Sequence, residues 1–193
     1  MPSSGRCSGL TTCLAPEGLG NLWGGAPSGL AFLRLVSTSA ALVLVGGGPI
    51  RARAVATGAA MLAGPAGPQA LRNFYAGSDV VVIPSIPTRD FLEPWGLVAN
   101  EAFDQGVPVI ATDAVGAAAG GLIEHERTGL VVPAGDAEAL AAALRRLHDD
   151  PALRTRLGAA GRDAVKAHSH AAWADGMARA LAAVGAGRPR DGC

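Results

Sequence analysis

The sequence predicts an α/β fold, a doubly wound parallel sheet with helices on both faces. Short apolar runs bounded by Gly and Pro recur along the chain, which is typical of strands buried on both sides of a parallel sheet. Segments with helical spacing lie between these runs, and this alternation predicts right-handed strand–helix–strand crossovers. The chain has 193 residues, of which 49% are hydrophobic and 17% charged, so it can form a sizeable core.

Five apolar runs are candidate strands. Four of them are closed by Gly or Pro residues, and the fifth, which starts at residue 59, is the weakest because alanine and glycine dominate it. The runs are ALVLV (41–45), AAMLAG (59–64), VVVI (80–83), PVIAT (108–112) and GLVVP (129–133).

Three segments between these strands predict helices, and the tail predicts two or three more. The first helix opens with Pro68, a residue favoured at the first helical position. The second ends at Gly106, and the third begins after Asp136, which suits an N-cap. The segments are 68–79, 96–106 and 136–150, followed by further helices from Pro151 to about Val184.

Composition divides the chain into three parts. Residues 1–40 are rich in Gly, Ser, Thr and Pro and predict an irregular arm that ends in one helix or strand. Residues 41–184 predict the α/β domain, and residues 185–193 a flexible tail. The most apolar stretch, 29–48, is interrupted by Arg34 and by a Ser-Thr-Ser run, so no transmembrane segment is expected.

Charge and cysteine content exclude several classes of function. Sixteen basic and sixteen acidic residues cancel, so no nucleic-acid partner is expected. Cys7, Cys13 and Cys193 are an odd number without CxxC spacing, which predicts neither a disulfide framework nor a metal site. No signal peptide is indicated either, and a cytoplasmic location without a cofactor is the expectation.

The loop after residues 80–83 leads to a helix start that suits an anion. Ligands of doubly wound sheets bind at the carboxyl ends of the strands, where helix N-termini point their amides. The amides of Gly96, Leu97 and Val98 have no partner within the helix, and the helix dipole favours a negative charge there. Gly96 has no side chain to block a close approach. This corner is therefore predicted to hold a phosphate.

Two glutamates, Glu93 and Glu101, flank this predicted anion seat. Glu101 lies about 6–7 Å further along the helix axis than Leu97, and Glu93 precedes the helix. A carboxylate can accept hydrogen bonds from two vicinal hydroxyls, so a ligand with hydroxyls on both sides of its phosphates would satisfy both acids. A nucleotide sugar has that layout. The alternative is that both glutamates are solvated surface acids, as most glutamates are.

The segment from about Ala41 to Leu181 resembles the C-terminal half of family 4 ("group 1") retaining glycosyltransferases of the GT-B fold. The resemblance implies that residues 41–184 form a Rossmann-like domain that binds a nucleotide sugar. It is carried, in order, by LVGGGP, YAGSDVVVIPS, EPWGLVANEAFDQGVPVIATDAVG, RTGLVVPAGDAEALAAAL and DDPALRTRLGAAGRDAV.

The resemblance also implies roles for the site residues. In this family an E-x7-E motif binds the donor, so Glu93 would contact the donor sugar and be the catalytic carboxylate, while Glu101 would bind the ribose. The amides of Gly96, Leu97 and Val98 would bind the diphosphate. Transfer would be metal-independent with retention of configuration, and the sequence has no Asp-x-Asp motif to hold a divalent ion. The implied partners are a nucleoside diphosphate sugar and a sugar or lipid acceptor, in polysaccharide biosynthesis.

The chain departs from the family pattern in three places. It has no room for the family's N-terminal acceptor domain. A lysine that would help to clamp the diphosphate is missing near Arg6, since the only lysine is Lys166. The spacing between GGGP (46–49) and the strand at 59–64 is short for a full helix. A non-catalytic or truncated nucleotide-sugar-binding module that works with a separate acceptor domain therefore stays an alternative, as does a sugar-nucleotide epimerase.

Two further features of the loop region have structural interpretations. Trp95 is expected to pack its ring beside the loop and so to order the site. The glycine-rich segment 116–122 is expected to be flexible, and it would either close over the sugar or form a plain surface loop.

Overall fold

The computed structural model describes residues 10–14, 40–46, 60–89 and 92–185. Six strands form one sheet in the order β3-β2-β1-β4-β5-β6, and every neighbouring pair is parallel. The strands are β1 (Leu10–Leu14), β2 (Ala40–Val45), β3 (Ala60–Gly64), β4 (Val80–Ile83), β5 (Val109–Thr112) and β6 (Gly129–Val132).

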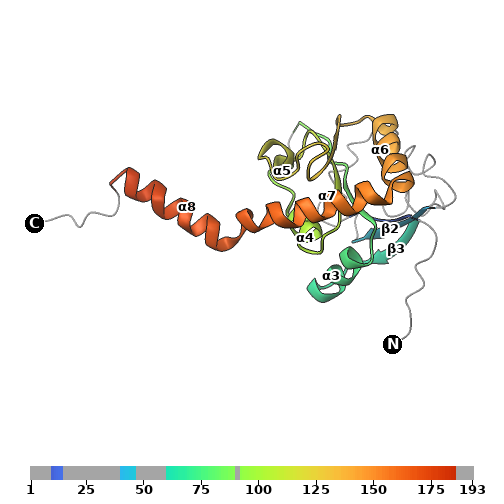
Figure 1. Cartoon of the computed structure of the whole chain (residues 1–193), viewed down its shortest axis with the longest axis horizontal. Coiled ribbons are helices and arrows are strands. Elements are labelled where there is room, and N and C mark those ends of the chain that lie inside the picture. The colour runs from blue at the N-terminus through green and yellow to red at the C-terminus, as the bar shows by residue number, and fades with distance from the viewer. Residues whose placement is uncertain (1–9, 15–39, 47–59, 90–91, 186–193) are drawn as a thin grey trace, which may run out of the picture.

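Helices follow the later strands and extend the chain beyond the sheet (Figure 1). They are α3 (Pro68–Ala76), α4 (Leu97–Asp104), α5 (Gly116–Ala119), α6 (Ala137–Asp149), α7 (Pro151–Ala164), the 3₁₀ turn η1 (Val165–His168) and α8 (His170–Ala183).

The five predicted strands and the predicted helices are confirmed to within a few residues. The structure also contains the strand β1, which the sequence does not predict. It lies inside the segment 1–40, whose composition predicts an irregular arm. It pairs with β2 on one side and with β4 on the other, so it occupies the middle of the sheet. The division into an arm, a domain and a tail otherwise stays a prediction.

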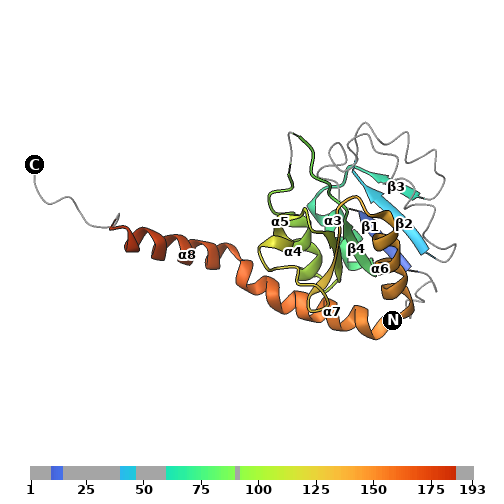
Figure 2. The ribbon, with the colours of Figure 1, turned by 90° about the horizontal axis from the view of Figure 1, so that it is seen from above.

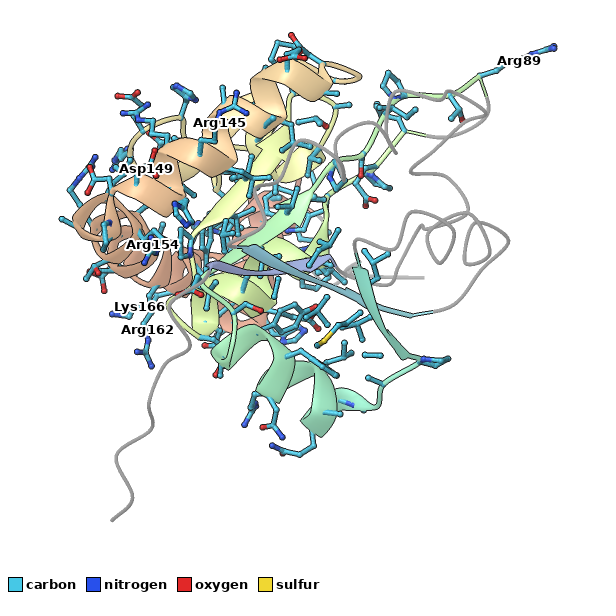
Figure 3. The ribbon with its side chains drawn as sticks, turned by 90° about the vertical axis from the view of Figure 1, so that its right-hand side faces the viewer. Arg89, Arg145, Asp149, Arg154, Arg162 and Lys166 are labelled. Carbon is cyan, nitrogen blue, oxygen red and sulfur yellow. The ribbon has the colours of Figure 1, made fainter. Side chains whose placement is uncertain are left out.

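Both faces of the sheet are buried, as the doubly wound fold requires. Alternate residues of β4 contribute to two separate cores: Val80 and Val82 belong to one, Val81 and Ile83 to the other. The first core contains leucines of α6 and α7, and the second contains residues of α3, α4 and α5. Figure 3 shows α3 on one side of the strands and α6 with α7 on the other. The continuous apolar runs of the sequence follow from this two-sided burial.

Side chains of the helix termini fix α6 and α7. Asp136 accepts a hydrogen bond from the amide of Ala139 at 2.9 Å, which confirms it as the N-cap of α6. Asp150 caps α7 in the same way, at 2.8 Å from the amide of Leu153. Both bonds satisfy amides that a helix start leaves unpaired.

The loop before β6 is held by charged side chains of these helices. Glu126 has φ of 63°, a left-handed conformation that is uncommon for residues other than glycine. Its carboxylate pairs with Arg146 on α6, and its carbonyl accepts from Arg156 Nη1 on α7 at 3.0 Å. The hydrogen bond from Arg146 lowers the pKa of Glu126 below its ordinary value.

Glycines let α7 approach α4 closely. A Cβ on Gly161 would lie 2.3 Å from Cδ1 of Phe103, and one on Gly158 would lie 2.1 Å from the carbonyl oxygen of Gly106. Phe103 is fully buried and belongs to α4. The helix that carries the predicted site is therefore packed against α7 with no room for a further methyl group.

The last helix, α8, extends away from the body of the molecule (Figures 1 and 2). It exposes three large apolar side chains four residues apart: Trp173 is 68% exposed, Met177 44% and Leu181 48%. Among the described residues no helix combines the length and the apolar character that crossing a membrane requires.

We expect Gly161→Ala to lower the free energy of unfolding by about 1–3 kcal/mol, because the new methyl group must displace the buried ring of Phe103. The matched control is Gly176→Ala in α8, where the nearest atom, Nη2 of Arg179, is 3.9 Å away. There alanine should leave stability unchanged or raise it by up to about 1 kcal/mol, because it favours the helix. Urea unfolding of both variants tests this. Equal stability of the Gly161→Ala variant and the unmodified chain would contradict the packing of α7 on Phe103.

Candidate functional site

The predicted site lies where the strand order of the sheet reverses. β1 and β4 are neighbours, and the chain builds β2 and β3 to one side of them and β5 and β6 to the other. A crevice at the carboxyl ends of the strands is expected at such a switch point. The loop that leaves β4 at this edge runs through Glu93 to the start of α4.

The start of α4 requires a glycine at position 96. Gly96 is the N-cap of α4 with φ of 86° and ψ of 67°, a left-handed conformation that side chains disfavour. A Cβ there would also lie 2.9 Å from Cγ1 of Val115. No side chain caps α4, and Leu97 is 63% exposed. The first amides of α4 are thus presented without a side-chain partner, as the sequence predicts.

Glu93 is held beside this helix start by its backbone. Its carbonyl accepts from the amide of Gly116 at 3.1 Å, and it forms a parallel bridge with Val115. Its Cγ lies 3.8 Å from the position that a Cβ on Gly96 would take, so the two residues are adjacent. The Glu93 side chain is partly exposed. The acid therefore stands next to the predicted anion seat.

Within the segment 116–122, whose glycine content predicts a flexible loop, residues Gly116–Ala119 form the short helix α5, which packs onto the loop before α4. The amide of Ala117 donates to the carbonyl of Trp95 at 2.7 Å. A Cβ on Gly116 would lie 1.9 Å from the carbonyl oxygen of Pro94, and one on Gly120 would lie 2.5 Å from the Trp95 ring. The glycines permit close packing here rather than motion.

Trp95 packs beside the loop, as expected, and also joins it to two other elements. Its indole nitrogen donates to Oδ1 of Asn100 on α4 at 2.8 Å. Its ring centroid lies 5.5 Å from that of His168 in η1, with the planes tilted by 34°. The ring thus orders the start of α4 from outside the anion seat.

Glu101 has a partner that the sequence interpretation missed. The hydroxyl of Tyr75 on α3 donates to Oε2 of Glu101 at 2.7 Å. Tyr75 is 2% exposed, whereas Glu101 is exposed. A buried tyrosine needs a partner for its hydroxyl, which is a usable signal, but the partner lies 26 residues away and cannot be read from spacing.

Hydrogen bonds also tie the loops after β4, β5 and β6 to one another. Thr112, which is 2% exposed, donates its hydroxyl to the carbonyl of Ser85 at the end of β4. Asp113 accepts from the amide of Ala134 at 2.8 Å through Oδ1. The carboxyl edge of the sheet is therefore one connected surface from β4 to β6.

The charged residues labelled in Figure 3 lie on two sides of the molecule. Figure 3 shows Arg89 at the tip of the loop after β4, extended away from the body. In the same view the labelled charged residues of α6, α7 and η1 lie on the opposite side of the molecule. Arg6 and the short segment 47–59, which depart from the family pattern, lie outside the described residues. Within the described ranges no group of three or more His, Cys, Asp or Glu side chains is placed to hold a metal ion.

The geometry offers an uncapped helix N-terminus between two carboxylates. Amides and the helix dipole can bind a phosphate group at Gly96–Val98. The carboxylates of Glu93 and Glu101 can accept hydroxyl hydrogen bonds on either side. Of the five predicted site residues, Glu93, Gly96, Leu97 and Val98 lie in the loop before α4 and at its start, and Glu101 lies one turn further along the helix.

Comparison with known proteins agrees with this arrangement. A family model described as "Glycosyl transferases group 1" matches residues 30–150. The lipopolysaccharide core biosynthesis glycosyltransferase LpsD of Rhizobium meliloti is 42% identical over 94 residues, which are 49% of this chain and 25% of that protein.

Solved structures show the same fold. Sucrose-phosphate synthase from Thermosynechococcus elongatus superimposes with a TM-score of 0.76 at 28% identity, over 97% of this chain and 47% of that one. HepE of Anabaena, in complex with UDP and glucose, superimposes with a TM-score of 0.72 at 19% identity, over 91% of this chain and 49% of that one.

The chain spans less than half the length of these proteins. The family match nevertheless covers most of the chain, and the sheet has the Rossmann-like topology of their GT-B fold. The chain belongs to the group 1 glycosyltransferase family.

Proposed function

We propose that this chain is the donor-binding half of a retaining glycosyltransferase, which takes a nucleoside diphosphate sugar as donor and a sugar or lipid as acceptor. The observation that carries the proposal is the uncapped start of α4 between Glu93 and Glu101. Membership of the family and the UDP and glucose held by the HepE structure support a nucleotide sugar as the ligand class. Hexosyl transfer in polysaccharide biosynthesis is part of the proposal.

In this proposal the diphosphate lies on the amides of Gly96, Leu97 and Val98. The bond between the anomeric carbon and the diphosphate oxygen breaks, the acceptor hydroxyl oxygen bonds to the same carbon, and the hydroxyl proton passes to the leaving diphosphate. Negative charge develops on the leaving diphosphate, where fixed amides and the helix dipole stabilise it without reorganisation.

The two glutamates then have separate roles. Glu93 lies in the loop before the amides, so it would contact the hydroxyls of the transferred sugar and be the carboxylate nearest the reacting carbon. Glu101 lies one turn into α4 and would accept from the ribose hydroxyls. The close contacts of Gly116 and Trp95 hold Glu93 in place, so its position needs no ordering when the donor binds.

A module that binds the nucleotide sugar without transferring it is the second candidate. The observation that favours it is that the described site residues are assigned to the donor, and none of them to an acceptor. Release of nucleoside diphosphate from the donor, measured with and without a separately supplied acceptor-binding domain, separates the two candidates. A module releases none in either case.

Calorimetry should show that the chain binds UDP, GDP or ADP more tightly than inorganic phosphate, though weakly, because the described site offers only the contacts of α4 and the loop before it. Gly96→Ala should weaken this binding about tenfold or more, because a side chain would both strain the left-handed cap and clash with Cγ1 of Val115, which displaces the first amides of α4. The control is Gly67→Ala at the N-cap of α3, where a Cβ would meet nothing within 4 Å. Equal affinity for phosphate and for all three nucleotides would contradict the proposal.

Glu101→Ala should weaken binding of a nucleoside diphosphate with or without a sugar, while Glu93→Ala should weaken only the sugar conjugate. Loss of a charged hydrogen-bond acceptor typically costs about 1.5–3 kcal/mol, or about tenfold to a hundredfold in affinity. Titration of both variants with both ligands measures this. The assignment of the two acids is wrong if Glu93→Ala impairs both ligands equally and Glu101→Ala impairs neither.

Any transfer that is detected should not depend on a divalent metal, because the sequence has no Asp-x-Asp motif and the helix amides take the place of a cation at the diphosphate. Initial rates in a chelator and in added magnesium or manganese should agree. Activity that is lost in the chelator and restored by manganese would overturn this expectation.

A further inference from the structure

We propose that Tyr75 is a positioning residue for donor binding: its buried hydroxyl holds the Glu101 carboxylate in the orientation that receives the ribose hydroxyls. The inference rests on the proposed function, because that function gives Glu101 its ligand. It adds a residue from α3, an element that the E-x7-E motif does not include.

The hydrogen bond between Tyr75 and Glu101 is short and joins α3 to α4. Tyr75 lies in the last turn of α3 and is 2% exposed. Its hydroxyl oxygen is 2.7 Å from Oε2 of Glu101, a distance typical of a hydrogen bond to an ionised carboxylate. The ring is fixed by the core that lies between the sheet and α4. The donor is therefore rigid, while the acceptor is on the surface.

An exposed glutamate would otherwise populate several rotamers. Fixing such a side chain when a ligand binds costs conformational entropy and so weakens binding. The bond from Tyr75 selects one rotamer before the ligand arrives, so this cost is removed from binding.

The bond also leaves the carboxylate free to accept from a ligand. A carboxylate has about four acceptor positions, and Tyr75 uses one of them on Oε2. Within the described part of the chain, Oε1 of Glu101 accepts no hydrogen bond. Two vicinal hydroxyls can therefore be accommodated while the bond to Tyr75 persists.

A purely structural role makes a different prediction. A buried tyrosine hydroxyl needs an acceptor in any case, so the bond could serve only the stability of α3 against α4. In that case loss of the hydroxyl would affect all ligands of the site alike. A positioning role affects only ligands that carry a ribose, and only while Glu101 is present.

The experiment measures binding to the full chain by calorimetry, with inorganic pyrophosphate and with whichever of UDP, GDP and ADP the chain binds most tightly. Tyr75→Phe should weaken the nucleotide about threefold to tenfold and leave pyrophosphate unchanged. The matched control is Ser78→Ala, which removes a hydroxyl that donates to the carbonyl of Phe74 at 2.7 Å beside the end of the same helix. This control should bind both ligands as the unmodified chain does. In a Glu101→Ala background, Tyr75→Phe should cause no further loss.

Three outcomes would overturn the inference: unchanged nucleotide affinity in Tyr75→Phe, an equal loss for pyrophosphate, or the same loss in the Glu101→Ala background. A different result would contradict the proposed function itself. If Glu101→Ala itself binds the nucleotide as the unmodified chain does, the ribose assignment is wrong and the inference falls with it. If Glu101→Ala weakens binding and Tyr75→Phe does not, only the inference is wrong.

A second measurement needs no variant. Tyr75 is the only tyrosine of the chain, so biosynthetic labelling with 3-fluorotyrosine gives a single fluorine resonance from this residue. We expect this resonance to shift when the nucleotide saturates the site and to stay in place with pyrophosphate. A resonance that does not respond to the nucleotide, or that responds equally to pyrophosphate, would contradict the positioning role.

Discussion

The candidate site depends on one close approach between two backbones, that of Gly116 over Pro94. The loops that leave β4 and β5 meet there, and the amides of Gly116 and Ala117 donate to the carbonyls of Glu93 and Trp95. A single methyl group on Gly116 would lie 1.9 Å from the carbonyl oxygen of Pro94, so only glycine permits the contact. The direction in which α4 begins follows from this contact, because the loop is held on both sides of Pro94 before it turns at Gly96.

The two carboxylates beside the helix start are held by different means. The backbone of Glu93 is held by the hydrogen bond from the amide of Gly116 and by the bridge to Val115. Glu101 is placed by the helix, and its side chain accepts from Tyr75. In the proposed function Glu101 binds the ribose, which is common to all donors of one nucleotide. A fixed acceptor lowers the entropic cost of binding the constant part.

Most of the sheet could be predicted from sequence because two-sided burial produces continuous apolar runs, as at β2 and β4. The strand β1 could not, because its sequence LTTCL carries two threonines between leucines within a Gly- and Ser-rich segment. The helix start and its two acids could be predicted, since Glu93, Gly96 and Glu101 are close in sequence. The contacts of Gly116 with Pro94 and of Tyr75 with Glu101 join different elements, and no local periodicity encodes them.

The helix that carries the candidate site is held by contacts from its start to its last turn. Asn100 accepts from Trp95, Glu101 accepts from Tyr75, and Phe103 is packed against Gly161 of α7. A binding surface that is already ordered loses little affinity to rearrangement, so the affinity of this chain for a donor reflects the contacts that it supplies. The acceptor-binding half would then add contacts to a preformed seat. In this proposal donor binding does not require the acceptor-binding half, because α4 is already rigid, whereas transfer requires both halves.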